Sequence, residues 1–191
     1  MTARPAGKVR IVAGAKRGHR LVVPPVADLR PTSEKVREAI FDVLGAVRDL
    51  VVLDLFAGTG AMGLEALSRG AKSCVFVEKD TAVATVLWEN ITSLGYQLSS
   101  RVIVSDYRQA LQRLAGVRSG FDLLFVDPPY RMLPDVEATL VPLLSSVLKD
   151  DGVAVIEGER ALQVTFGDAP LFDRTYGDTR VTMIRMRRSI R

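Results

Sequence analysis

The sequence has few residues that could cross-link the chain or bind a metal ion. Its 191 residues include one cysteine, Cys74, and one histidine, His19. These counts exclude an intramolecular disulfide framework and a zinc site built from several cysteines or histidines, so we expect no metal. No apolar run approaches the ~20 residues that span a bilayer, and residues 1–5 lack the apolar stretch of a signal peptide. We therefore expect a cytoplasmic protein.

The net charge of +4 conceals an uneven distribution along the chain. Residues 1–30 carry a charge of +6 and residues 174–191 a charge of +5, which leaves −7 for residues 31–173. Basic ends around an acidic centre favour binding of a polyanion by the ends and a different chemistry in the centre. Two solvated tails would have the same composition, but the N-terminal basic residues alternate with Val and Ile, which favours a structured surface.

The N-terminal part of the sequence predicts a small basic extension. Short runs of β-forming residues at 9–13 and 20–23 flank a basic segment that contains glycine, a pattern typical of a β-hairpin with a basic tip. Apolar residues at helical spacing after residue 33 then predict an amphipathic helix of about three turns that ends near Gly45. We expect residues 1–29 to form a basic extension that binds a polyanion and residues 30–191 to form the main domain.

From residue 50 the sequence alternates between strands and helices. We expect strands at 50–55, 73–77, 102–104, 121–126 and 153–156, helices at 61–68, 81–94, 108–114 and 135–148, and a final antiparallel pair at 162–166 and 181–187. Strands that are apolar throughout are typical of a parallel sheet with both faces covered. The predicted fold is a doubly wound, mostly parallel, seven-stranded Rossmann-like α/β sheet with an antiparallel C-terminal strand pair.

A glycine-rich loop follows the first of these strands. Gly58, Gly60 and Gly63 satisfy the G-x-G-x-x-G pattern between a strand and a helix, and Glu78 ends the next strand 20 residues after Gly58. Glycines let the backbone approach a ligand closely, and a carboxylate at the end of the second strand can accept the hydroxyls of a ribose. A tight turn without a ligand is the alternative interpretation.

Asp54 decides between two classes of ligand, a dinucleotide and S-adenosylmethionine. This acid lies four residues before Gly58, at the end of an otherwise apolar strand. A pyrophosphate gains nothing from a nearby carboxylate, whereas the cationic amino-acid end of S-adenosylmethionine does. Asp106 follows the third strand and fits two roles equally well, an acceptor for the adenine amino group and a helix N-cap.

The fourth strand ends in Asp127-Pro128-Pro129-Tyr130. Two consecutive prolines form a rigid extended corner. The side chain of Asp127 and the carbonyl of Pro128 could each accept one hydrogen of an exocyclic amine, while Tyr130 stacks on the attached ring. Such a pocket would free the nitrogen lone pair for attack on a methyl sulfonium, chiefly by positioning and electrostatic preorganisation. A stiff turn with an exposed tyrosine is the structural alternative.

These motifs resemble those of class I S-adenosylmethionine-dependent methyltransferases that modify exocyclic amines. The segment 30–41, with the sequence Arg-Pro-Thr-Ser-Glu-Lys-Val-Arg-Glu-Ala-Ile-Phe, and the hairpin at 9–21 before it are similar to the RsmD family. The resemblance covers nearly the whole chain. It implies transfer of a methyl group from S-adenosylmethionine to the N2 amine of one guanine in 16S ribosomal RNA, within an assembled or partly assembled 30S subunit. S-adenosylhomocysteine would be the product.

The motifs and the resemblance together assign three sets of residues. Those expected to handle the target base are Asp127, Pro128, Pro129 and Tyr130. Those expected to line the cofactor site are Asp54, Phe56, Ala57, Gly58, Thr59, Gly60, Glu78, Asp106 and Thr32. Those expected to contact RNA phosphates are Arg10, Lys16, Arg17, His19, Arg20 and Arg37.

Other functions remain open on the sequence alone. The same corner at 127–130 would serve an N6-adenine methyltransferase acting on nucleic acid or a protein glutamine methyltransferase. A protein that binds RNA without catalysis would have lost acids such as Asp54, Glu78 or Asp127, and all three are present. A nicotinamide dehydrogenase would explain neither the corner nor the basic hairpin. No apolar stripe exceeds the needs of the fold, so we expect a monomer.

Overall fold

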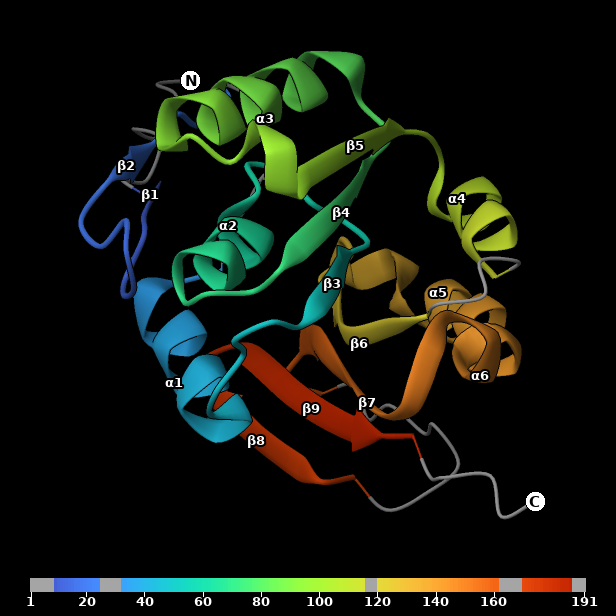
Figure 1. Ribbon diagram of the computed structural model, residues 1–191. Coiled ribbons are helices and arrows are strands. Elements are labelled where there is room, and N and C mark those ends of the chain that lie inside the picture. Colours follow the sequence, from blue (N-terminus) through green and yellow to red (C-terminus); the bar gives the residue numbers. More distant parts are fainter. Residues whose placement is uncertain (1–8, 25–31, 116–119, 162–169, 187–191) are drawn as a thin grey trace, which may run out of the picture.

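Seven strands form one sheet that is surrounded by helices and a small hairpin (Figure 1). The structure, a computed structural model, describes residues 9–24, 32–115, 120–161 and 170–186. Strands β3 to β7 run parallel to one another, whereas β9 is antiparallel to both β7 and β8. In sheet order the strands are β5 (Ser100–Val104), β4 (Ser73–Glu78), β3 (Val51–Asp54), β6 (Phe121–Val126), β7 (Leu148–Glu159), β9 (Thr179–Arg185) and β8 (Phe172–Tyr176). The predicted Rossmann-like α/β sheet is confirmed.

The helices cover both faces of the sheet. One face packs against α1 (Glu34–Leu44), α2 (Ala61–Ser68) and α3 (Thr81–Leu94), and the other against α4 (Tyr107–Leu114), α5 (Leu133–Leu140) and α6 (Leu144–Val147). Short 3-10 turns lie at Gln97–Ser99, Tyr130–Met132 and Val141–Leu143. Among the described residues no helix is long and apolar enough to cross a membrane.

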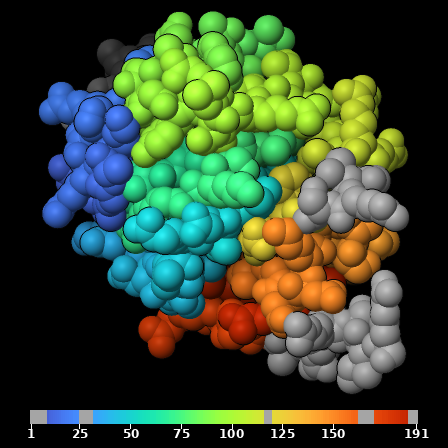
Figure 2. All heavy atoms as spheres, in the orientation of Figure 1, coloured from blue at the N-terminus to red at the C-terminus, as the bar shows by residue number. Residues whose placement is uncertain are grey.

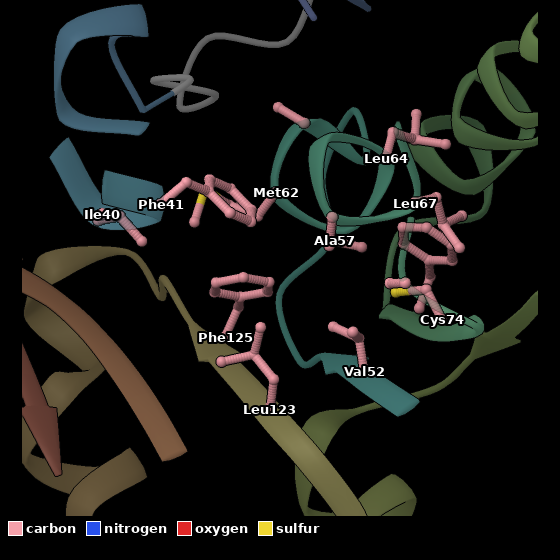
Figure 3. Packing of buried hydrophobic residues seen from close by; sticks show 14 of the residues in the cluster. Ile40, Phe41, Val52, Ala57, Met62, Leu64, Leu67, Cys74, Leu123 and Phe125 are labelled. Carbon is pink, nitrogen blue, oxygen red and sulfur yellow. The ribbon is translucent and has the colours of Figure 1, made fainter. Parts of the chain in front are cut away.

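Two hydrophobic clusters, one on each face, explain why the central strands are apolar throughout. Leu123 of β6 points into the cluster under α1 to α3, and the next residue, Leu124, points into the cluster under α4 to α6. Figure 3 shows Phe41 of α1 and Met62 of α2 above Phe125 of β6. The rings of Phe41 and Phe125 are 5.8 Å apart between centroids, so this contact packs α1 onto the centre of the sheet.

The order of the strands reverses at β3. From β3 the chain moves outward to β4 and β5 on one side, and it then returns to form β6 and β7 on the other side (Figure 1). Ligands of doubly wound proteins bind at the carboxyl ends of the strands where this reversal occurs. The ends of β3, β4 and β6 are therefore the expected position of the functional site.

Two predicted elements differ from the structure. The helix expected at 135–148 is interrupted because Pro142 cannot donate a helical hydrogen bond, and Leu148 already belongs to β7. An antiparallel C-terminal pair is present, but the neighbour of β9 is β8, at residues 172–176. The strand expected at 162–166 and the last residue of the one expected at 181–187 lie outside the described residues.

The basic hairpin, formed by β1 (Val9–Arg10) and β2 (Arg20–Leu21), is held on α2 by polar contacts. The buried carboxylate of Glu65 accepts hydrogen bonds from the backbone N–H groups of Val12 and Ala13, at 2.7 and 2.9 Å. Ser68 donates its hydroxyl to the carbonyl of Ala13 at 2.6 Å. A Cβ atom on Gly14 would lie 1.9 Å from the Ser68 carbonyl oxygen, so only glycine permits this approach. The predicted hairpin is thus a fixed part of the fold.

Candidate active site

The first half of the site is the glycine loop between β3 and α2. Gly60 adopts a left-handed conformation with φ of 83° and precedes α2 directly. The Asp54 carboxylate accepts the backbone N–H of Gly63 at 3.0 Å, which ties the start of α2 to the end of β3. A Cβ atom on Gly63 would lie 2.3 Å from a ring carbon of Phe76, so the glycine is required for packing. The loop is held in one shape before any ligand binds.

Asp54 is a buried acid whose charge is not fully balanced. Burial, together with the nearby carboxylates of Asp127 and Glu78, raises its pKa to about 7, while the hydrogen bond from Gly63 opposes the shift. A ligand that brings positive charge would stabilise the ionised form. The cationic amino-acid end of S-adenosylmethionine meets this requirement, as the sequence predicts.

Glu78, at the end of β4, joins the glycine loop to the start of α3. One of its oxygens accepts the N–H of Gly58 at 3.0 Å, and the other accepts the N–H of Asp80 at 2.9 Å. A carboxylate has about four lone-pair directions, so both oxygens can also accept ribose hydroxyls. The sequence-based assignment of Glu78 is therefore compatible with this geometry.

The remaining residues assigned to the cofactor lie around this loop in different roles. The Phe56 ring packs against that of Tyr107 with centroids 5.1 Å apart. Thr59 is buried, and its carbonyl accepts a hydrogen bond from Asn90 at 3.0 Å. Asp106 caps α4 by accepting the N–H of Arg108 at 2.9 Å. The N-cap role of Asp106 is confirmed, and its role as an adenine acceptor stays a prediction.

The second half of the site is the proline corner after β6. Asp127 is partly exposed, and its Oδ2 atom accepts the hydroxyl of Thr32 at 3.0 Å. Burial raises the pKa of Asp127 to about 6, and the Thr32 hydroxyl opposes this shift. Pro128 is buried and Pro129 exposed, and the Tyr130 hydroxyl lies 3.2 Å from the hydroxyl oxygen of Thr179 on β9. The corner is anchored on both sides and carries a carboxylate whose pKa is raised above its ordinary value.

Thr32 lies in the acceptor half of the site. The resemblance implies that it lines the cofactor site, whereas its hydroxyl contacts the carboxylate assigned to the target base. Phe125 of β6 pairs in register with Asp54 of β3, so Asp127 follows two residues beyond the end of the β3–β6 pairing. Thr32 therefore joins the N-terminal segment to the corner where the acceptor is expected.

Sequence reasoning missed two buried polar residues at this edge. Glu157 of β7 is 5% exposed, and within the described residues no hydrogen bond reaches its Oε1 atom. Burial and the charge of Asp127 raise its pKa well above the ordinary value. Asn90 of α3 bonds to both backbone groups of Val22 and to the carbonyl of Thr59. Two signals in the sequence could have identified them. Glu157 directly follows an apolar strand, and Asn90 lies on the apolar face of a helix.

Five of the six residues assigned to RNA reach the protein surface, and the sixth, Arg37, is buried. Arg17, His19 and Arg20 are exposed on the hairpin, and Arg10 is exposed and paired with Glu34 at 2.9 Å. The ammonium group of Lys16, which is half-buried, lies 5.8 Å from the centroid of the Tyr96 ring. These side chains lie together on the surface of β1, β2 and their connection, the blue region of Figure 2.

The assignment of Arg37 to RNA is wrong. Its side chain is 1% exposed, because the guanidinium enters the protein and donates to the carbonyls of Thr32 at 2.8 Å and Arg10 at 2.6 Å. A phosphate cannot contact this guanidinium in the conformation that the structure shows. Among the described residues no group of three or more histidine, cysteine, aspartate or glutamate side chains is arranged to hold a metal ion.

Comparison with known proteins places the chain among the methyltransferases. The family described as conserved hypothetical protein 95 matches residues 9–185. Ribosomal RNA small subunit methyltransferase D of Escherichia coli is 42% identical over 127 residues, covering 66% of this chain and 62% of that protein. The protein of the same name from Haemophilus influenzae is 32% identical over 155 residues, covering 81% of this chain and 80% of its own length.

Solved structures show the same architecture. The structure of yhhF from Escherichia coli has a TM-score of 0.80 at 31% identity and covers 96% of this chain and 100% of that one. An RNA methyltransferase from Salinibacter ruber, in complex with S-adenosyl-L-homocysteine, shares the fold with a TM-score of 0.66 at 19% identity, covering 85% and 97% of the two chains.

Proposed function

The chain belongs to the RsmD family of rRNA methyltransferases, and we propose that it methylates the N2 amine of one guanine in 16S ribosomal RNA. The substrate in this proposal is the 30S subunit or an assembly intermediate. The observation that carries it is the position of Asp127, a partly exposed carboxylate at the proline corner beside the glycine loop. No other described acid combines these features with a rigid backbone carbonyl next to it.

The cofactor is S-adenosylmethionine, which supplies a methyl group on a positively charged sulfur. The residues present fit it. Asp54 provides buried negative charge, the glycine loop exposes backbone, and Glu78 holds oxygens at the position expected for a ribose. Each of these groups is already fixed by a hydrogen bond, so binding requires little reorganisation.

The acceptor half has to bind the amine and remove a proton from it. In the proposal, Asp127 and the Pro128 carbonyl each accept one hydrogen of the amine, and the nitrogen lone pair attacks the methyl carbon. A carbon–nitrogen bond forms, the carbon–sulfur bond breaks with its electrons remaining on sulfur, and one amine proton leaves to Asp127. A pKa of about 6 suits this carboxylate to accept that proton near neutral pH.

The basic hairpin gives the proposal a means of binding the RNA. Arg17 and Arg20 are exposed and free to contact phosphates, which position an RNA without reading its sequence. The target guanine must leave its stack to reach the corner at 127–130. We propose that residues 1–29 act as the RNA-binding extension and 30–191 as the catalytic domain, and that the enzyme acts as a monomer.

The test is transfer of a labelled methyl group to 30S subunits that lack N2-methylation of small-subunit guanines, followed by mass analysis of the nucleosides. N2-methylguanosine at a single position is the expected product. Label in N6-methyladenosine or in ribosomal protein glutamine would retain the methyltransferase chemistry and refute the substrate. Asp127→Asn is the matched control, because it keeps the shape of the side chain and should abolish most of the transfer.

A further inference from the structure

The acceptor carboxylate is connected to the RNA-binding hairpin by a short chain of hydrogen bonds. Asp127 accepts the hydroxyl of Thr32 at 3.0 Å, and the carbonyl of Thr32 accepts one guanidinium nitrogen of Arg37 at 2.8 Å. The other terminal nitrogen of Arg37 donates to the carbonyl of Arg10 in β1 at 2.6 Å. One buried side chain therefore contacts the backbone of the hairpin and the backbone of the residue that holds Asp127.

The bond from Thr32 fixes the direction of the Asp127 carboxylate. It occupies Oδ2 and leaves Oδ1 for the substrate amine. Thr32 is itself 8% exposed, so its hydroxyl is not exchanged freely for water. Without this donor the carboxylate could rotate about its terminal torsion, whose energy profile is broad, and the amine would meet an acceptor of undefined orientation.

We propose that Thr32 is a positioning residue for Asp127. We further propose that Arg37 couples the orientation of Asp127 to the position of the basic hairpin on α2. The proposal rests on the proposed function, since it gives a role to residues around the same acceptor pocket. Arg37 carries no contact to RNA in this scheme. It acts through the two backbone carbonyls that it bridges, so a hairpin displaced from α2 would also loosen the segment that carries Thr32.

The electrostatic surroundings support a role beyond packing. The groups around Asp127 are Asp54 on β3, Glu157 on β7, and Arg37 on α1 behind Thr32. Burial raises the pKa of both Asp127 and Glu157, and the charge of Asp127 raises that of Glu157 further. The Thr32 hydroxyl favours the ionised form of both carboxylates, because its hydrogen bond lowers the pKa of Asp127 and that of Glu157.

The experiment compares Thr32→Val, which keeps the shape and removes the hydroxyl, with Thr32→Ser, which restores it. Thr32→Val should lower kcat roughly 10- to 100-fold, the effect of a misplaced catalytic group, without changing the affinity for S-adenosylmethionine. The acidic limb of the pH–rate profile should move to higher pH, because the Thr32 hydroxyl lowers the pKa of Asp127 in the wild type and its removal raises that pKa. Thr32→Ser should restore both kcat and the profile. Thr85→Val, an exposed threonine on α3, is the matched control and should behave as wild type.

The coupling part is tested with Arg37→Met, which keeps an unbranched side chain and removes the donors to both carbonyls. Combined with Thr32→Val it should lower kcat no further than Thr32→Val alone, because both changes interrupt one path. Additive losses would refute the coupling. Unchanged kcat and pH profile in Thr32→Val would refute the positioning role, and an equal loss of cofactor affinity would assign Thr32 to the cofactor instead.

A titration of the Asp127 carboxyl by NMR separates this proposal from the proposed function. It is made on the free protein and needs no RNA. If wild type fails to methylate guanine, the proposed function is wrong, and the titration still decides the role of Thr32. A higher midpoint in Thr32→Val supports the contact as a determinant of Asp127, and an unchanged midpoint refutes it.

Discussion

Replacing Glu65 with glutamine should release the basic hairpin from α2. The carboxylate is fully buried and accepts three hydrogen bonds, from the N–H groups of Val12 and Ala13 and from the Arg69 guanidinium at 2.8 Å. Glutamine retains one oxygen for two of these donors and places an NH2 group against the third. One unsatisfied buried N–H costs about 1–3 kcal/mol, and the loss of charge weakens the other two bonds, so about 3 kcal/mol should be lost.

Two measurements test this value. A loss of about 3 kcal/mol should lower the melting temperature by about 6–12 °C in a chain of this length, and hydrogen exchange should show weaker protection of the amides of Val12 and Ala13. Cofactor affinity should not change, since Asp54 and Glu78 do not contact Glu65. Glu89→Gln, an exposed glutamate of α3, should have no effect. A Glu65→Gln variant with wild-type melting and wild-type exchange at these amides would refute the account of how the hairpin is held.

Three further predictions concern the cofactor site and the RNA surface. Affinity for S-adenosylmethionine should rise between about pH 5.5 and 7.5, because a cation binds best to ionised Asp54, whose pKa burial raises to about 7; calorimetry showing no pH dependence would contradict this. Gly63→Ala should lower the unfolding free energy by about 1–3 kcal/mol, because its Cβ would lie 2.3 Å from the ring of Phe76; urea denaturation measures this, and an unchanged midpoint would disprove the packing argument. Replacing Arg17 and Arg20 with glutamine should weaken rRNA binding and reduce its salt dependence; a defect of equal size at all salt concentrations would exclude phosphate contacts.

The parallel sheet and the two halves of the site could be predicted from local patterns. The apolar run at 121–126 predicts a strand that is buried on both faces. The spacing of the three glycines after β3 predicts a tight loop between a strand and a helix. The acids at the strand ends were predictable for the same reason, because parallel strands bring their carboxyl ends to one edge. Asp54, Glu78 and Asp127 lie where that reasoning puts them.

The contacts that connect the hairpin to the site could not be predicted. Glu65 and Asn90 bond to backbone groups 52 to 68 residues away, and no local pattern identifies such partners. From the sequence alone, Arg37 is expected to be exposed. In the structure it is buried because its guanidinium donates to two backbone carbonyls, those of Thr32 and Arg10. The strand at 172–176 was missed because most of its residues are polar and exposed, so its apolar signal is weak.

We propose that the edge of the sheet is divided into a cofactor half and an acceptor half. The most direct test measures S-adenosylmethionine affinity and single-turnover methyl transfer side by side for wild type and Asp127→Ala. We expect the variant to bind the cofactor as wild type does and to lose most of the transfer. A parallel loss of binding and transfer would place Asp127 in the cofactor site and contradict the division, and wild-type transfer would remove it from the reaction.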